Sequence, residues 1–264
     1  MNTEDHPRRR TELVEEPFEI QFPQRDRDEV EQDEEWCEVR LAGQRRQIRF
    51  HDYAEIYAWR GLYEQLFYDE LKCDSPRTVC SLLAEQLDSE GIDPAELRVF
   101  DVGAGNGMVG EQLAGIKAGS AVGVDIIQAA AEATDRDHPD VYEDYFVLDL
   151  TDIPPDTLED LQGRRFNCMT SVAALGFGDI PPDAFAAAFN LVEDGGHVAF
   201  NIKEDFMAQA DDSGFSGLIR DALEDGTIEL ERDRRYRHRL SVTGEPLHYL
   251  AMVAEKRRDL RLTA

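Results

Sequence analysis

An acidic residue and three glycines stand close together at the end of a short apolar run. Asp101 lies inside the run 99–102, and Gly103, Gly105 and Gly107 follow it directly. Glycine has no Cβ atom, so it permits positive φ angles and lets a ligand approach the backbone closely. The N–H groups of such a turn, and of the helix after it, are expected to remain available to a ligand. The segment therefore predicts a strand that runs into a loop for a nucleotide-type cofactor.

Two kinds of cofactor loop fit these glycines. No Gly-Lys-Ser/Thr follows them, which excludes a Walker-type phosphate cradle. The register 105–110 satisfies the dinucleotide pattern G-x-G-x-x-G, so an NAD(P)-dependent oxidoreductase is one alternative. However, the first glycine after the strand is Gly103, which gives G-x-G-x-G instead. The Asp101 carboxylate also suits a cationic ligand better than a pyrophosphate, because ionised acceptors bond most strongly to charged donors.

The loop resembles motif I of the class I S-adenosylmethionine-dependent methyltransferases, in which an acidic residue precedes G-x-G-x-G. Asp125 ends the next apolar run, 22 residues after Gly103, where both cofactor families place an acceptor for ribose hydroxyls. Asp149 ends a third run, where the resemblance implies a residue that holds the adenine amino group. S-adenosylmethionine is therefore the expected cofactor. The expected cofactor-binding residues are Tyr53, Tyr57, Asp101, Gly103, Ala104, Gly105, Asn106, Gly107, Asp125, Ile126, Asp149, Leu150 and Ser171.

Strands and helices alternate around this loop. Apolar runs predict strands over 99–102, 121–125, 145–148, 165–172, 197–202, 227–232 and 247–254. A turn is predicted at Asp194–Gly196, and helices are predicted over 77–87, 182–191 and 213–223, the first with Asp74 as its N-cap. The predicted fold is α/β, with a doubly wound, seven-stranded, mostly parallel sheet and a terminal antiparallel hairpin. This is the Rossmann-like methyltransferase fold, expected over 76–264.

The chain before this domain divides into two parts. Residues 1–35 are dense in charged side chains and predict an acidic, disordered tail. Residues 36–75 hold alternating segments that predict a β-hairpin, then an aromatic stretch that predicts a lid helix. Tyr53 and Tyr57 lie four residues apart and share one face of that helix. A packed amphipathic helix with no lid function is the alternative.

The charge balance restricts the partners. The chain has 56 acidic and 28 basic side chains and a formal net charge of −28, which disfavours nucleic acid as an acceptor. We interpret the basic run Arg232–Arg239 as a solvated edge strand. The sequence shows no apolar stretch of about 20 residues and no secretory signal core, so we predict no membrane partner and a cytoplasmic location. The four cysteines have no C-x-x-C spacing, and no metal site is predicted.

The sequence leaves the chemistry at the acceptor open. Methyl transfer is an in-line displacement that positioning alone can accelerate, so a base is needed only where the acceptor carries a proton. The candidate bases are His51, His238 and His248, with Glu204 and Asp205 as carboxylate alternatives. The segment after 165–172 lacks the Asn/Asp-Pro-Pro-Tyr/Phe motif of enzymes that methylate exocyclic or amide nitrogens, and it lacks the Pro-Cys nucleophile of cytosine methylation.

Substrate contacts are expected at the edge of the sheet that binds the cofactor. Asn201 and Lys203 end a predicted strand there, and open α/β sheets bind ligands at that edge. Residues 60–205 also resemble the uncharacterised Williams-Beuren-region methyltransferases, which implies no particular substrate. The expected acceptor is a small molecule or a protein, and the oligomeric state stays open. A non-catalytic, cofactor-binding interaction module is the second alternative.

Overall fold

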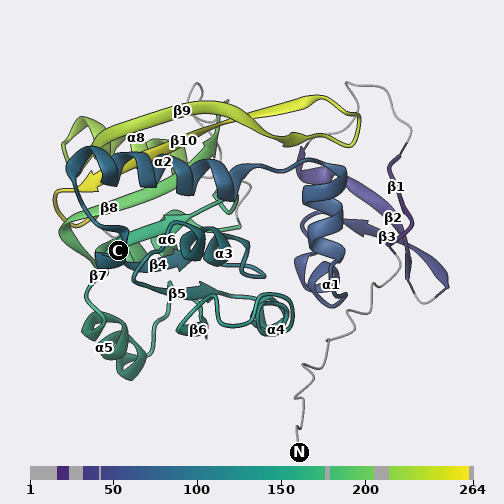
Figure 1. Ribbon diagram of the computed structural model, residues 1–264, viewed down its shortest axis with the longest axis horizontal. Coiled ribbons are helices and arrows are strands. Elements are labelled where there is room, and N and C mark those ends of the chain that lie inside the picture. Colours follow the sequence, from purple (N-terminus) through teal and green to yellow (C-terminus); the bar gives the residue numbers. More distant parts are fainter. Residues whose placement is uncertain (1–16, 24–31, 42, 176–178, 205–213, 262–264) are drawn as a thin grey trace, which may run out of the picture.

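Two sheets organise the protein (Figure 1). The computed structural model describes residues 17–23, 32–41, 43–175, 179–204 and 214–261. Within this part of the chain, the larger sheet has seven strands in the order β6-β5-β4-β7-β8-β10-β9. Their bounds are Arg98–Val102 (β4), Ser120–Asp125 (β5), Asp144–Val147 (β6), Phe166–Ser171 (β7), Val192–Lys203 (β8), Ile228–Leu240 (β9) and Pro246–Lys256 (β10).

The strand directions confirm the predicted fold class. β4 runs parallel to β5 and β7, β5 to β6, and β7 to β8, whereas β10 is antiparallel to both β8 and β9. The terminal hairpin is longer than predicted, because pairing with β10 continues through Arg232–Arg239 and places that basic run on the edge strand. The predicted turn at Asp194–Gly196 lies inside β8, where Gly195 has a φ of +83° beside a shift in the β7–β8 register.

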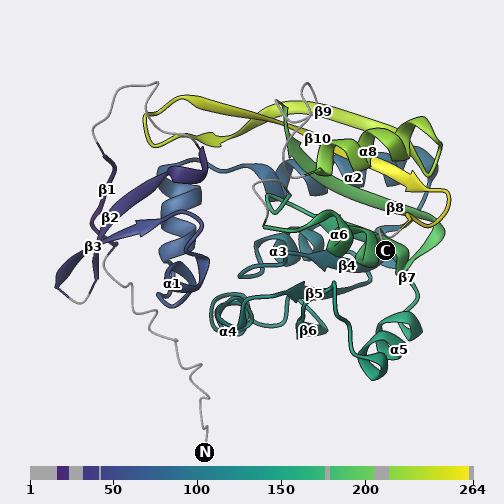
Figure 2. The same ribbon diagram turned by 180° about the vertical axis from the view of Figure 1, so that it is seen from behind.

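Helices cover both faces of the large sheet (Figures 1 and 2). α2 and α3 pack on one face, and α5, α6 and α8 pack on the other. α2 begins after Asp74 as predicted, but this carboxylate accepts from the side chains of Arg77 and Thr78 instead of capping a backbone N–H. The helix bounds are Ser75–Glu90 (α2), Met108–Gly115 (α3), Gln128–Asp137 (α4), Pro155–Gly163 (α5), Pro182–Asn190 (α6) and Phe215–Glu224 (α8).

A small antiparallel sheet precedes the large one. β2 (Trp36–Leu41) and β3 (Gln44–Arg49) form the predicted hairpin, and β1 (Ile20–Gln21) pairs with β2. The expectation of a disordered tail is therefore corrected for 17–23 and 32–35. The physical reason is burial, because Phe18, Ile20 and Phe22 pack against the apolar cluster of this sheet. Two short 3₁₀ helices span Gln32–Glu34 (η1) and Pro94–Glu96 (η3).

The aromatic segment forms two short helices instead of one lid helix. α1 spans Tyr53–Tyr57, and a π-helix, η2, spans Glu64–Glu70. Between them Gly61 has a φ of +74°, a left-handed conformation that interrupts a right-handed helix. Both helices lie between the small sheet and the strand ends of the large one (Figure 1).

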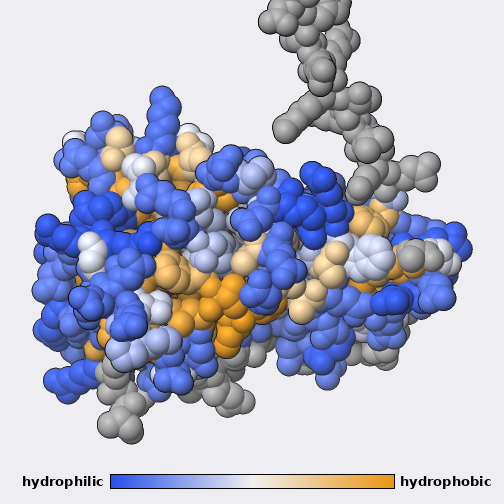
Figure 3. Space-filling model, turned by 90° about the horizontal axis from the view of Figure 1, so that it is seen from below, coloured by the Kyte–Doolittle hydropathy of each residue, from blue (hydrophilic) through white to orange (hydrophobic). Residues whose placement is uncertain are grey.

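Charged and polar side chains cover most of the face in Figure 3, with an apolar zone near its centre. Among the described residues, the exposed large hydrophobic side chains are Ile126, Val147 and Leu230. The helices within the described ranges are all too short or too polar to cross a bilayer.

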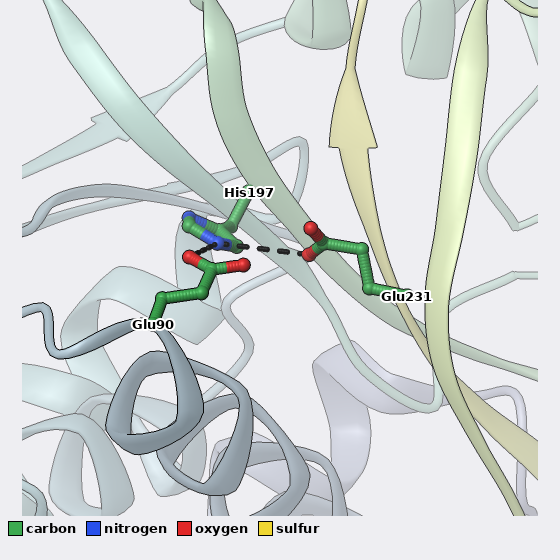
Figure 4. Close-up of side chains that lie close together, drawn as sticks. All are labelled: Glu90, His197 and Glu231. Carbon is green, nitrogen blue, oxygen red and sulfur yellow. Dashed lines mark hydrogen bonds and ion pairs between the residues drawn. The ribbon is translucent and has the colours of Figure 1, made fainter.

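Three ionisable side chains fasten the end of α2 to the sheet (Figure 4). His197 Nε2 lies 3.0 Å from Glu90 Oε2 and 3.6 Å from Glu231 Oε2. The atoms of these side chains that could ligate a metal all lie within 4.8 Å of one another. The ion pairs from His197 to the two glutamates hold the three side chains together. No local pattern pointed to this cluster, because its members come from α2, β8 and β9. We assign it a structural role.

We expect Glu231→Gln to stabilise the protein more at pH 8 than at pH 5. Burial and the Glu90 carboxylate raise the pKa of Glu231 to about 7, with Glu255 adding to the rise and Arg257 opposing it. Between its ordinary pKa and about 7, the folded state holds a proton that the unfolded state has released, so raising the pH destabilises the fold. Glutamine does not ionise, so the variant does not lose stability in this way as the pH rises.

Thermal unfolding at pH 5, 6, 7 and 8 measures this effect. Asp233→Asn, which replaces an exposed carboxylate on the same strand, is the control and should give the same small difference from wild type at every pH. A Glu231→Gln difference that does not grow with pH would contradict the prediction.

Candidate cofactor pocket

A pocket of about 520 Å³ lies at the carboxyl ends of β4, β5, β6 and β7. This size suits a small-molecule site, and the location is the binding edge of an open α/β sheet. α1 and the start of η2 roof the pocket, and the segment after β7 closes one side. The expected cofactor residues that line it are Tyr53, Tyr57, Gly103, Ala104, Gly105, Asn106, Asp125, Ile126, Asp149 and Leu150.

The glycine loop is held by its own hydrogen bonds. Gly103 N and Ala104 N donate to Val124 O, at 2.9 and 3.0 Å, and Gly105 N donates to Asp125 Oδ2 at 3.0 Å. The expectation that the loop's N–H groups remain available to a ligand is therefore wrong for these three residues. Their donors fix the loop onto β5 instead. The loop offers a ligand a close backbone surface rather than a set of anion-binding donors.

Asp125 joins the loop to the end of β5. Its Oδ1 accepts from Ile127 N at 2.9 Å, while Oδ2 holds Gly105 N. Burial raises the pKa of this carboxyl, and the backbone hydrogen bonds oppose the rise. Each carboxylate oxygen can accept a second hydrogen bond. Asp125 can therefore hold the loop and accept from a ligand's hydroxyl groups together.

Asp149 and Ile126 stand at the open side of the pocket. Asp149 is exposed, and hydrogen bonds from the Thr151 hydroxyl and backbone N–H lower the pKa of its carboxyl, so it is ionised at neutral pH. Ile126 is 62% exposed, which is unusual for a large aliphatic side chain. The Asp149 carboxylate accepts hydrogen bonds, and the Ile126 side chain beside it is apolar and exposed. Together they suit a flat heterocycle that carries an amino group.

The roof is made of neutral tyrosines. Tyr57 and Tyr63 pack with ring centroids 5.1 Å apart, and Tyr53 stacks on Tyr57 at 6.1 Å. Burial raises the pKa values of all three well above the neutral range. Tyr57 comes so close to the loop that a Cβ atom on Gly105 would lie 2.7 Å from its hydroxyl oxygen.

A carboxylate from η2 also ties the roof to the loop. Glu64 Oε1 accepts from Asn106 Nδ2 at 2.6 Å and lies 3.0 Å from His138 Nε2. This contact raises the pKa of His138. Roof and loop are thus one hydrogen-bonded unit.

Asp101 is corrected from a ligand contact to a buried structural residue. It is fully buried and does not line the pocket. Its carboxylate accepts from Tyr142 Oη and Thr170 Oγ1, both at 2.5 Å. Burial raises its pKa to about 6 despite these bonds.

Gly107, Ser171 and Asn201 also lie outside the pocket lining. Gly107 is the N-cap of α3 and packs against α4. Ser171 Oγ donates to Val102 O at 3.1 Å, which ties β7 to β4. Asn201 is buried, and its Oδ1 accepts from Ala173 N at 2.7 Å, so it positions a lining residue without reaching the pocket itself.

Most candidate bases also lie elsewhere. Glu204 pairs with Arg235 at 2.8 Å, and neither Lys203 nor His248 lines the pocket. His238 is buried, which lowers its pKa well below the usual value and keeps it neutral, and it hydrogen-bonds Ser75 Oγ at 2.6 Å. Asp205 lies outside the described residues.

His51 is the candidate base that the structure brings to the pocket. It lines the wall, and its Nδ1 lies 3.2 Å from a carboxylate oxygen of Asp179. Asp179 was not among the predicted site residues, although it lies in the segment after β7 that was searched for acceptor motifs. The two residues are 128 positions apart, so no local pattern could pair them.

Comparison with known proteins agrees with this geometry. Residues 71–239, more than half of the chain, match a family model described as a methyltransferase domain. The chain belongs to this methyltransferase family. The match includes the glycine loop and the ends of β5, β6 and β7, so the methyltransferase domain supplies the floor of the pocket. The narrower resemblance to the Williams-Beuren-region methyltransferases stays a prediction.

Solved methyltransferases are similar to this chain at low sequence identity, and the first of those described here shares its fold. The N-methyltransferase NodS from Bradyrhizobium japonicum, in complex with S-adenosyl-L-homocysteine, is 11% identical with a TM-score of 0.52, over 78% of this chain and 97% of that one. Magnesium protoporphyrin IX methyltransferase from Synechocystis, with bound SAM, is 16% identical with a TM-score of 0.48, over 69% and 79%. A putative RNA methyltransferase from Pyrococcus horikoshii is 14% identical with a TM-score of 0.49, over 67% and 83%. No curated protein matches this methyltransferase chain.

Proposed function

We propose that this chain is an S-adenosylmethionine-dependent methyltransferase that transfers a methyl group by in-line displacement to a small acceptor beside the cofactor. The observation that carries the proposal is the arrangement around the glycine loop. Asp125 and Asp149, at the ends of neighbouring strands, face one pocket with the exposed Ile126 beside them. Asp125 would accept from the ribose hydroxyls. Asp149 would accept from the adenine amino group, and Ile126 would cover the ring.

The same pocket suits a sulfonium cofactor better than a dinucleotide. A pyrophosphate needs backbone donors, and the N–H groups of Gly103, Ala104 and Gly105 are already used within the protein. The lining instead contains carboxylates and tyrosine rings, both of which attract cations. S-adenosylmethionine supplies an electrophilic methyl group. The protein's own part is to position the acceptor and exclude water, and positioning can contribute up to about 7–11 kcal/mol.

A small molecule or an exposed protein side chain is the favoured kind of acceptor. The net charge of −28 opposes nucleic acid, and the basic run on β9 is largely paired. Arg232 donates to Gln86, Arg234 to Glu85 and Arg235 to Glu204. These contacts support its interpretation as an edge strand. A cytoplasmic location and a domain boundary near residue 76 complete the proposal.

Calorimetry with the full chain tests the cofactor. We expect S-adenosylmethionine and S-adenosylhomocysteine to bind with one site per chain and micromolar dissociation constants, and NAD to give no heat. Binding of NAD with no heat from S-adenosylmethionine would replace the proposal with the oxidoreductase alternative. If S-adenosylmethionine binds but labelled methyl groups reach no metabolite or protein pool, the result favours a non-catalytic interaction module that binds the cofactor.

A further inference from the structure

A second, smaller cavity of about 50 Å³ adjoins the cofactor pocket. The two share five wall residues, His51, Tyr53, Tyr63, Ala173 and Asp179. The remaining walls come from η1, the residue that follows β3, η2, the segments before α2 and after β7, and the β9–β10 hairpin. The volume is enough for a small polar group but not for a whole cofactor. A ligand in the larger pocket therefore has a side chamber with its own chemistry.

The chamber contains a buried hydrogen-bond acceptor to which no described group donates. Gln32 Nε2 donates to Tyr249 Oη at 2.9 Å, but Gln32 Oε1 is buried and has no hydrogen-bond partner among the residues that the structure describes. Leaving a buried carbonyl unpaired is costly, so such an atom points to a ligand that donates. Asp179 adds a carboxylate on the shared wall. Both polar groups accept hydrogen bonds, and neither is a cation.

The cation in the wall is already compensated. Arg239 pairs with Glu35, and these side chains are only 5% and 2% exposed. His238 stays neutral and packs on Tyr249 with ring centroids 4.1 Å apart. A carboxylate or phosphate ligand would thus meet no uncompensated positive charge in these walls. An amine meets acceptors and aromatic faces, both of which favour N–H donors and cations.

We propose that this chamber is the acceptor subsite and that it takes the amino end of a small amine, with Gln32 and Asp179 as acceptors for its N–H groups. The assignment rests on the proposed methyltransferase function and deepens it. Both oxygens of Asp179 lie near His51 Nδ1, at 3.3 and 3.2 Å. Each carboxylate oxygen can accept a second hydrogen bond, so Asp179 can orient that ring and still accept from the amine.

The reaction balances with the groups present. The ammonium form of the acceptor loses one proton to the His51 imidazole. The freed nitrogen lone pair then forms the N–CH₃ bond as the C–S bond breaks, and the bonding electrons leave on sulfur as a neutral thioether. The proton on His51 passes to solvent. The products are a methylated amine, S-adenosylhomocysteine and one proton.

Radiolabelled methyl transfer with the full chain tests the amine class. Primary arylalkylamines of increasing length are compared with alcohols, thiols and carboxylates of the same carbon skeletons. We expect label in amines and none above background in the other three sets. Label in another class, or in no class, overturns the amine assignment. Binding of S-adenosylmethionine, measured separately by calorimetry, shows whether the proposed function itself survives.

Variants test the residues against the best amine from that set. Asp179→Asn and Gln32→Leu should each raise the KM for the amine by at least about tenfold while the Kd for S-adenosylmethionine changes less than about twofold. His51→Gly should lose at least about 100-fold in kcat and regain activity with added imidazole, which a structural role would not produce. His248→Gln, outside both cavities, is the control and should match wild type.

Unchanged KM values in both Asp179→Asn and Gln32→Leu overturn the subsite. If Asp179→Asn fails to fold, Gln32→Leu decides alone, because within the described residues the Gln32 side chain makes one hydrogen bond, to Tyr249, and its Oε1 makes none. A His51→Gly variant that folds but does not respond to imidazole overturns the role of His51.

Discussion

Asp125→Ala is expected to weaken binding of S-adenosylmethionine by at least about 100-fold. The substitution removes the acceptor for the ribose hydroxyls, and hydrogen bonds to a charged group contribute about 1.5–3 kcal/mol each. It also releases Gly105 N and Ile127 N, which Asp125 holds at 3.0 and 2.9 Å. The loop therefore loses its anchor together with the ligand contact. Calorimetric titration of the folded variant measures the change.

Asp156→Ala is the matched control for this experiment. Asp156 is an exposed aspartate in the first turn of α5 and lies outside the pocket, so its removal should leave the dissociation constant within about twofold of wild type. An Asp125→Ala protein that melts like wild type and binds the cofactor within tenfold of wild type would remove Asp125 from the proposed site.

Glu35→Ala is expected to cost about 3–5 kcal/mol of folding free energy. Glu35 pairs with Arg239 of β9, and its other oxygen accepts from Val242 N at 2.7 Å. Both charged side chains are almost fully buried. Removing one partner leaves the other as an uncompensated charge in a low-dielectric environment, which is among the largest penalties of a point substitution. Urea denaturation measures the free energy of unfolding.

Glu34→Ala tests whether the loss of folding free energy depends on the burial of the glutamate. Glu34 is the preceding glutamate but is exposed, so its loss should change the unfolding free energy by less than about 0.5 kcal/mol. Equal destabilisation by the two variants would show that Glu35 contributes no more than an ordinary surface charge.

Local patterns predicted the floor of the site well. The sequence predicted the run that contains Asp101, the glycines after it, and the strands that lead to Asp125 and Asp149. A buried parallel strand and the loop after it leave a continuous signal in the sequence. The alternation of strands and helices also predicted the doubly wound, mostly parallel sheet. The family match and the topology confirm that interpretation.

Contacts between segments far apart in the sequence could not be predicted from local patterns. Asp101 looks like a ligand contact in sequence, but Tyr142 and Thr170 enclose it from two other elements. Asp179 gains its place only because the fold brings it to His51. β1 went unpredicted because two residues carry no periodicity, and it forms by pairing with β2. Patterns within one segment do not encode such contacts between segments.

The roof of the pocket and its floor come from different stretches of chain. α1 and η2 precede residue 71, where the family match begins, whereas the glycine loop and the ends of β5 and β6 follow it. On the proposed assignments, the residues that recognise the methyl donor lie in the floor of the pocket. Much of the chamber for the methyl acceptor lies in the roof. A chimaera that exchanges the first 70 residues between related proteins would then change the acceptor and keep the donor. Selection could act on one without disturbing the other.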